Sequence, residues 1–278
     1  MSGSAHPVAR GQRPVHNVAT AATVDGAQVV GRIAAVLRAV SAAMPGGLTT
    51  AEAAAATGLA RSTAHRLLTA LVADGFLDRE ADDGRWCLGP ELYLMGTVAA
   101  ERYDVTGVAR AAVRSLAAAT GESAFFSARR GDETVCLLRE EGSFPIRSFV
   151  LYEGIRFPLG VASAGLALLA HLPGAEVDRY LDGRGDALAD QFGAAHTADA
   201  IRRRIAMTRR VGYAVNPGLI VEGSWGMGAA VFDRTGAPAW ALSLTGIEPR
   251  FSASRRPELG RLLLEHAHAV GARLAQRH

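Results

Sequence analysis

The side chains best suited to chemistry near the amino end are two arginines, a histidine and two hydroxyl residues. They are Arg61, Ser62, Thr63, His65 and Arg66. Guanidinium groups bind phosphates and guanine edges in a bidentate manner, and hydroxyl groups bond to phosphates or bases. No acidic residue lies between positions 58 and 72. The cluster therefore suits contact with a nucleic acid, although an ordinary solvated helix face would have the same composition.

Two helices joined by a tight turn should position this cluster. Thr49 and Glu52 have the spacing of a capping box, so the first helix should begin at Thr49. Gly58 should end it, because glycine readily adopts a left-handed backbone conformation. The second helix has an apolar stripe on the face opposite the cluster. The stripe consists of Ala64, Leu67, Leu68 and Leu71.

The neighbouring segments extend this helix-turn-helix into a domain over residues 26–88. A further helix is predicted for residues 30–43, and a Pro-Gly-Gly sequence stops it. Apolar and polar residues then alternate on both sides of an Asp-Asp-Gly turn at residues 82–84, which predicts a β-hairpin. Three helices followed by such a hairpin make a winged helix-turn-helix, whose second motif helix reads the major groove.

Two residues outside the recognition helix are further candidates for DNA contact. Thr50 stands at the start of the first motif helix, and Arg85 stands at the tip of the hairpin. A solvated turn residue is an equally good interpretation of Arg85. Phe76 and Trp86 should pack the hairpin onto the core rather than touch DNA.

Residues 89–104 are predicted to form a helix that links the first domain to the rest of the chain. Its apolar members cover too wide a face for a free linker, so we expect this face to be buried against another chain or domain. These members are Leu92, Leu94, Met95, Val98 and Ala99.

Residues 105–278 predict an α+β domain built on an antiparallel sheet. Helices and hairpins are mixed there without a steady βαβ alternation. Helices are expected from residue 105 to 120 and over 162–172, 176–181, 198–210 and the carboxyl end, and strands over 123–129, 134–140, 146–152, 213–216, 226–233 and 238–246.

Composition limits the function classes that the chain can serve. The net charge is +3, and all 30 basic residues are arginine, which a GC-rich genome explains most simply. The chain has no apolar run long enough to span a membrane, and its two cysteines do not make a disulfide framework. Residues 1–25 do not have the pattern of a signal peptide, and we expect them to form a disordered tail. The expected location is the cytoplasm.

Two patterns that could suggest an enzyme lack the partner residues that such chemistry needs. Ser163 lies in the sequence VASAG, but a nucleophile elbow would need glycine at Val161, and no histidine and acid follow in hydrolase order. His266 and His268 are two residues apart on a helix, so they face different ways and do not form a metal pair. We expect no catalytic residue, no metal and no cofactor.

Several motifs occur together in an order typical of one family. After the winged helix-turn-helix and the linker helix come FPLGVASAGLALLA at 157–170, VGYAVN at 211–216 and GMGAAVFDRTGAPAWALSLTG at 226–246. On these motifs the chain, from about residue 29 to its end, resembles the IclR family of bacterial transcription regulators. The resemblance implies a winged-helix DNA-binding domain, a GAF-like effector domain, and a dimer or tetramer on operator DNA. It also implies that a small molecule in the second domain changes the affinity for DNA.

The resemblance implies effector-pocket positions, some of which keep the family's chemistry. The backbone stretch that binds a carboxylate in relatives corresponds to Ser163 and Ala164. Two hydroxyl residues on the last strand correspond to Ser243 and Thr245. The same hydroxyls could instead be structural groups with partners inside the core.

Other positions depart from the family pattern. Asn216 stands where relatives often have an acid, and Gly226 stands where they often have a cysteine. Near the start of the buried helix, Gly160 and Leu166 stand where relatives commonly have polar residues. The loss of the acid and the thiol argues against a very small oxo-acid as the effector.

Nearby residues suggest a larger pocket. Gly226 and Gly228 should open space, which Trp225, Phe125 and Phe149 could line. That lining would favour a larger, partly aromatic or apolar ligand. The alternative is that these aromatic residues are plain core.

Taken together, the sequence predicts a ligand-responsive regulator of double-stranded operator DNA, with repression favoured over activation. It should act as a homodimer or homotetramer and should not contact membranes. The alternatives are a DNA-binding dimer without a ligand switch, and a Ser163-dependent hydrolase.

Overall fold

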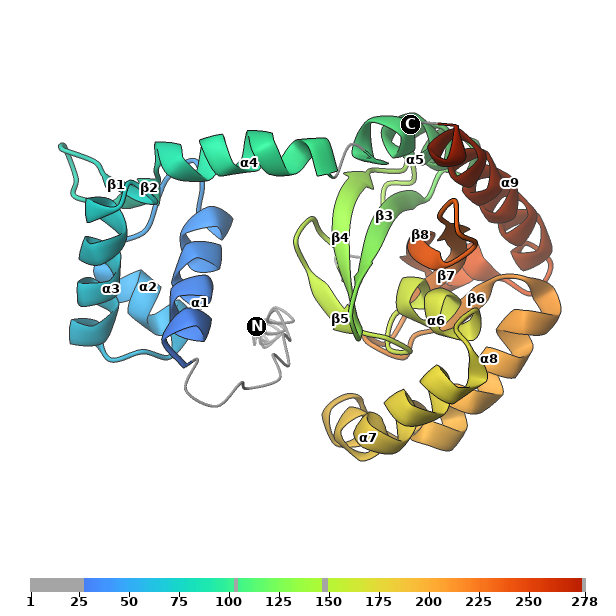
Figure 1. The fold of residues 1–278 in the computed structure, drawn as a ribbon. Coiled ribbons are helices and arrows are strands. Elements are labelled where there is room, and N and C mark those ends of the chain that lie inside the picture. The colour runs from blue at the N-terminus through green and yellow to red at the C-terminus, as the bar shows by residue number, and fades with distance from the viewer. Residues whose placement is uncertain (1–27, 103–104, 147–149, 277–278) are drawn as a thin grey trace, which may run out of the picture. The chain divides into compact units, whose positions relative to one another are not determined.

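The computed structural model describes residues 28–102, 105–146 and 150–276. These residues form two compact units, one before and one after residues 103–104 (Figure 1). The tail expected at 1–25 and Phe149 lie outside the described residues.

The first unit has the helices and the small hairpin of a winged helix-turn-helix, as predicted. Its elements are α1 (Gln28–Ala42), α2 (Thr50–Thr57), α3 (Arg61–Ala73), β1 (Leu77–Arg79), β2 (Trp86–Leu88) and α4 (Pro90–Arg102). The predicted capping box is present, because the Glu52 backbone N–H donates to Thr49 Oγ1 over 3.2 Å and the Thr49 N–H donates to Glu52 Oε2 over 2.8 Å. Gly58 ends α2 at a φ of 68°, in the left-handed region.

The core of this unit joins the three helices to the hairpin. Val36 and Val40 of α1 pack in one cluster with Leu68 of α3, and Trp86 from β2 is buried in the same cluster. Trp86 also exchanges two backbone hydrogen bonds with Leu48, in the segment that leads into α2. Phe76 is half-buried against this cluster, so the prediction that Phe76 and Trp86 pack the hairpin onto the core is confirmed.

Helix α4 presents apolar side chains to solvent. Tyr93 and Val98 are each 72% exposed, and Leu94 and Met95 are also exposed. The sequence predicted that this face would be buried against another chain or domain, whereas in the single chain it is exposed.

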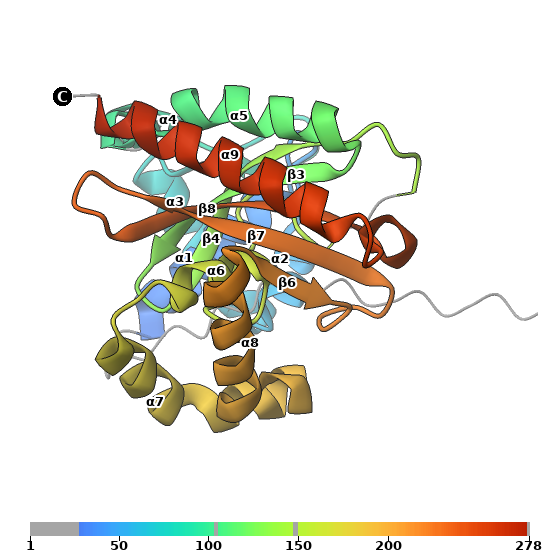
Figure 2. The ribbon, with the colours of Figure 1, turned by 90° about the vertical axis from the view of Figure 1, so that its right-hand side faces the viewer.

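The second unit contains a six-stranded antiparallel sheet with helices on both faces (Figure 2). Its strands are β3 (Ser123–Arg130), β4 (Glu133–Glu140), β5 (Arg156–Pro158), β6 (Ala214–Pro217), β7 (Ser224–Phe232) and β8 (Pro238–Ile247), in the order β5-β4-β3-β8-β7-β6. Its helices are α5 (Val105–Thr120), α6 (Ser163–Ala170), α7 (Gly174–Phe192), α8 (Ala198–Val211) and α9 (Arg256–Ala275), with short 3-10 turns η1 (Ala194–His196) and η2 (Glu248–Phe251). The predicted α+β architecture is therefore confirmed.

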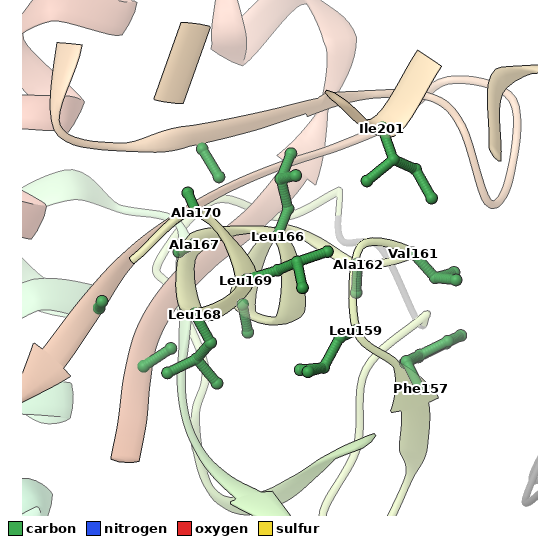
Figure 3. Packing of buried hydrophobic residues seen from close by; sticks show 14 of the residues in the cluster. Phe157, Leu159, Val161, Ala162, Leu166, Ala167, Leu168, Leu169, Ala170 and Ile201 are labelled. Carbon is green, nitrogen blue, oxygen red and sulfur yellow. The ribbon is translucent and has the colours of Figure 1, made fainter. Parts of the chain in front are cut away.

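The two faces of the sheet have separate cores. Helices α5 and α9 cover one face, and α6 covers the other, with α7 and α8 further out (Figure 2). Successive strand residues point to opposite faces, so Phe126 belongs to the α5–α9 core and Phe125 to the α6 core. All eight residues of α6 are buried, as its apolar sequence predicted, and its leucines project on different sides into the surrounding cluster (Figure 3).

The strand predicted at 146–152 is contradicted at its described residues, 146 and 150–152, none of which is in a strand, and residues 147–149 lie outside the described part of the chain. The edge strand β5 lies later, at Arg156–Pro158. Val150 and Leu151 are consecutive and both buried, whereas neighbouring residues of a strand face opposite ways. A turn at Gly154, whose φ is 85°, then returns the chain to β4.

Candidate functional site

Helix α3 presents the predicted basic cluster to solvent. The opposite face of the helix is buried in the core, so most of the cluster is exposed. The exposed residues are Arg61, Ser62, His65 and Arg66, and Thr63 is half-buried. The N-cap of α3 is an alanine without a side-chain cap. The first N–H groups of α3 are therefore open to an external acceptor, and the helix dipole makes an anion the favoured one.

Trp86 connects α3 to the other elements of its unit. Its ring lies 6.0 Å from that of His65 at an angle of 85°, an edge-to-face contact. Its indole N–H donates to Thr50 Oγ1 over 3.0 Å. Thr50 thus fixes the position of Trp86. Because the Thr50 hydroxyl acts as the acceptor in this bond, it can still donate its proton to another group.

Arg85 is engaged within the wing. Its Nη1 donates to the Gly47 carbonyl over 3.1 Å and lies 3.4 Å from Glu52 Oε2, and its Nε lies 3.2 Å from Asp83 Oδ2. Hydrogen bonds from Thr49, together with the charge of Arg85, hold the pKa of the Glu52 carboxyl below its usual value. Arg85 would have to exchange these partners in order to reach a phosphate.

The start of α6 packs directly on the sheet in the second unit. Ser243 and Thr245 are two apart on β8 and lie opposite Gly228 and Gly226 of β7, so these four positions share one face. A Cβ atom at Gly228 would lie 2.8 Å from the backbone of Ser163. The expectation that Gly228 opens space is therefore wrong, because the first turn of α6 fills that space.

A small cavity remains beside this packed helix start. Its volume is about 20 Å³, which is room for roughly one water molecule. The lining comprises Val150, Leu151, Ala162, Ser163, Asn216, Ile220, Ser224, Trp225, Gly226 and Thr245.

The cavity brings together five of the positions chosen from sequence: Ser163, Asn216, Trp225, Gly226 and Thr245. The other predicted effector positions, Ala164 and Ser243, are buried behind this lining. Phe125 is wholly buried in the core and does not line the cavity. For Phe125 this agrees with the alternative prediction that the aromatic residues belong to the core.

Five lining residues were not among the positions chosen from the sequence, and one of them, Ala162, directly precedes the predicted Ser163. Val150 and Leu151 had been assigned to a strand, although their adjacency in an apolar run is a signal of complete burial. Ile220 and Ser224 lie in and after the loop between β6 and β7, and no local pattern marks them.

The polar groups at the cavity have unmet hydrogen-bonding capacity. Thr245 is 5% exposed, and within the described part of the chain neither its Oγ1 nor the Oγ of Ser243 has a hydrogen-bond partner. Helix α6 has Ala162 as its N-cap residue and therefore no side-chain cap. The N–H groups of its first turn and the Thr245 hydroxyl could therefore bind an anionic or carbonyl group together.

Asn216 has a different role from these groups. Its Nδ2 donates to the Val161 carbonyl over 2.7 Å, and its Oδ1 accepts from the Leu219 N–H over 3.1 Å. The side chain thus ties the loop after β6 to the segment before α6. Because Asn216 is neutral where relatives often carry an acid, it does not repel an anion.

The arrangement offers no support for hydrolysis at Ser163. Among the described residues no histidine is hydrogen-bonded to the Ser163 hydroxyl, and a serine nucleophile needs an adjacent base. Nowhere in residues 28–102, 105–146 and 150–276 do three or more metal-binding side chains gather into a metal site. The helices in this described part are too short or too polar to span a lipid bilayer.

Two family models match most of the chain. The model described as "IclR helix-turn-helix domain" matches residues 29–81. The model described as "Bacterial transcriptional regulator IclR C-terminal" matches residues 97–272. The winged unit and the cavity-bearing unit thus each correspond to a known domain, and both domains come from regulators rather than enzymes.

Individual relatives agree with these models. The transcriptional repressor IclR of Escherichia coli strain K12 is 25% identical over 265 residues, which is 95% of each chain. A crystal structure of an IclR transcriptional regulator from Alicyclobacillus acidocaldarius is 25% identical, with a TM-score of 0.71, over 89% of this chain and 98% of that one. An IclR homologue from Microbacterium hydrocarbonoxydans, crystallised with 4-hydroxybenzoate, has the same fold at 23% identity and a TM-score of 0.71, over 89% and 99% of the two chains.

Proposed function

Because the chain belongs to the IclR family and is a DNA-binding transcriptional regulator with a C-terminal effector domain, we propose that it is a carboxylate-switched repressor. The observation that carries the switch is the Thr245 hydroxyl, which is buried beside the uncapped start of α6 and has no hydrogen-bond partner among the described residues. A carboxylate in the cavity would accept from both groups.

The DNA side of the proposal rests on the exposed cluster of α3. Arg61 and Arg66 are the proposed phosphate contacts, and Ser62, Thr63 and His65 face the base edges of the major groove. The open N–H groups of the first turn add a further phosphate site.

Thr50 and Arg85 have secondary roles in this proposal. Thr50 holds Trp86, against which His65 rests. Arg85 becomes a backbone contact of the wing when a phosphate replaces Asp83 or Glu52 as its partner.

The size of the cavity restricts how an effector can bind. A cavity of about 20 Å³ can hold part of the polar head of a ligand but is too small for an aromatic ring. The remainder of a larger ligand requires outward movement of apolar lining residues such as Val150, Leu151 or Ile220. The bound 4-hydroxybenzoate of the Microbacterium homologue makes aromatic carboxylates the first class to test.

The exposed face of α4 supports a homodimer or homotetramer. Tyr93, Leu94, Met95 and Val98 present apolar surface that a second copy of the chain would bury. A two-fold pair of recognition helices then matches two half-sites of an operator.

A combined DNA and ligand experiment tests this function. The purified protein is footprinted on the DNA upstream of its own gene, with and without benzoate and 4-hydroxybenzoate. A protected site that weakens with a carboxylate supports the proposal. A site that no carboxylate changes, together with no thermal shift, would instead indicate a DNA-binding dimer without a ligand switch.

A further inference from the structure

A second cleft opens in the effector domain, between the β3–β4 turn and α7. Its volume is about 340 Å³, within the range of small-molecule sites, and it shares no lining residue with the effector cavity. Arg129 and Asp132 line it from the hairpin, and Arg179, Gly183 and Arg184 line it from α7.

The charges around this cleft favour an anion. Arg129 is paired with Glu176, and Arg184 Nε lies 3.4 Å from Asp132 Oδ2, so each acid is matched by one arginine. Arg179 is exposed and makes no ion pair with any residue that the structure describes. The cleft therefore has one arginine in excess, and guanidinium groups bind carboxylate and phosphate in a bidentate manner.

Gly183 lies on the wall of the cleft, at a point where the cleft is open. It lies inside α7, where glycine weakens a helix, and an added Cβ atom would meet nothing within 4 Å. Two residues further on, an added Cβ at Gly185 would lie 2.9 Å from the Cβ of Ala198, so close packing explains that glycine. Packing therefore does not explain Gly183, and a side chain at this position would project into free space.

Leu159 connects the cleft to the effector cavity. Its N–H donates to the Asp132 carbonyl over 2.9 Å, and its carbonyl accepts from the Tyr180 hydroxyl over 2.8 Å. Two residues later, the Val161 carbonyl accepts from Asn216 of the effector cavity. The short segment 159–163 is thus held by cleft residues at one end and by cavity residues at the other.

We propose that this cleft is a second ligand site, which binds a small organic anion with several carboxylate or phosphate groups through Arg179 and the neighbouring arginines. The site is separate from the effector cavity. An anion bound there would affect that cavity through the segment that begins at Leu159. The binding itself does not depend on the proposed switch, although its regulatory consequence does.

The test is direct titration of the full-length protein at constant ionic strength, monitored by calorimetry. Citrate is the carboxylate probe and inorganic pyrophosphate is the phosphate probe. Saturable binding of at least one probe is expected, and the stronger one identifies the preferred oxyanion. Absence of saturable binding for both would overturn the proposal.

Variants locate the binding. Arg179→Ala should weaken it by about tenfold or more, because a charge-assisted contact is lost. Gly183→Leu should abolish binding by filling the cleft. Gly183→Ala adds only a methyl group to open space, so this variant should fold normally and show reduced binding. Arg203→Ala, which removes an exposed arginine of α8 that does not line the cleft, is the matched control and should bind as the wild type does. Equal affinity in Arg179→Ala, Gly183→Leu and this control would place the anion elsewhere and refute the site.

Discussion

The substitution Thr245→Val should raise stability and weaken effector binding at the same time. Thr245 is buried, and its Oγ1 has no hydrogen-bond partner among the described residues. Valine has nearly the same shape, so it removes the unmatched hydroxyl without leaving a hole. The same hydroxyl is the proposed donor to the carboxylate of the effector, and valine cannot replace it in that contact.

The magnitudes follow from the cost of an unmatched polar group. An unsatisfied buried hydroxyl costs about 1–3 kcal/mol, so the free energy of unfolding should rise by about 1–2 kcal/mol. For a unit of this size, that corresponds to an increase in Tm of roughly 2–8 °C. Loss of a hydrogen bond to a charged acceptor should weaken carboxylate binding by about 10–100-fold.

The assay compares thermal unfolding and carboxylate titration for two threonine variants. Thr134 is the matched control, because it is also a buried strand threonine, but its hydroxyl donates to the Phe157 carbonyl over 3.3 Å. Thr134→Val should therefore lower stability by about 0.5–1.5 kcal/mol and leave carboxylate affinity unchanged. If Thr245→Val were destabilising in the same way and bound carboxylates normally, the reasoning about the cavity would be refuted.

Three other predictions concern the DNA surface, the dimer and the pH response. Arg66→Ala should weaken binding to all DNA sequences and reduce the slope of log K against log salt by about 0.9, as loss of one phosphate contact requires, and an unchanged salt slope in a filter-binding series would exclude that contact. Val98→Glu places a charge on the exposed apolar face of α4 and should shift the sedimentation coefficient from oligomer to monomer, whereas an unaltered oligomer would show that this face is not the interface. Burial, followed by the charge of Arg204, lowers the pKa of His196, and burial followed by Arg209 likewise lowers that of His171. As the pH falls, these histidines are therefore protonated in the unfolded chain before they are protonated in the folded one. The free energy of unfolding should be at its full value above the ordinary histidine pKa of about 6.5 and should decrease as the pH drops below it. Melting curves of His196→Asn, which cannot titrate, should show a smaller loss, and identical curves would mean that His196 does not contribute.

The helical parts of the fold were predictable because local spacing determines them. The capping box of Thr49 and Glu52 defined the start of α2, and period 3.6 separated the buried face of α3 from its basic face. Helix α6 was predictable because a segment that is apolar all round has to be buried. These signals lie within a few residues of one another.

The unpredicted features depend on contacts between distant segments. Gly228 did not open space, because Ser163, 65 positions earlier in the chain, packs on it. The edge strand was misplaced because Val150 and Leu151 are apolar enough for a strand but line the cavity instead. Likewise, two of the acceptors that hold Arg85, the Gly47 carbonyl and the Glu52 carboxylate, come from distant segments that the sequence alone does not bring to it.

The family resemblance supplied candidate positions but not their geometry. Four of its effector positions, Ser163, Asn216, Gly226 and Thr245, do meet at one cavity. The cavity is smaller than the nearby aromatic residues suggested. Phe125 explains the difference, because it fills the core on the α6 side of the sheet instead of lining a pocket.

The central claim, that a carboxylate bound beside α6 changes operator affinity, is tested most directly by one pair of dissociation constants. Fluorescence anisotropy gives the Kd of the full-length protein for its footprinted operator, first free and then saturated with the best-binding carboxylate. A coupling of about 1–3 kcal/mol predicts that the two values differ by about 5–150-fold. Equal values, with the carboxylate shown to be bound, would contradict the account.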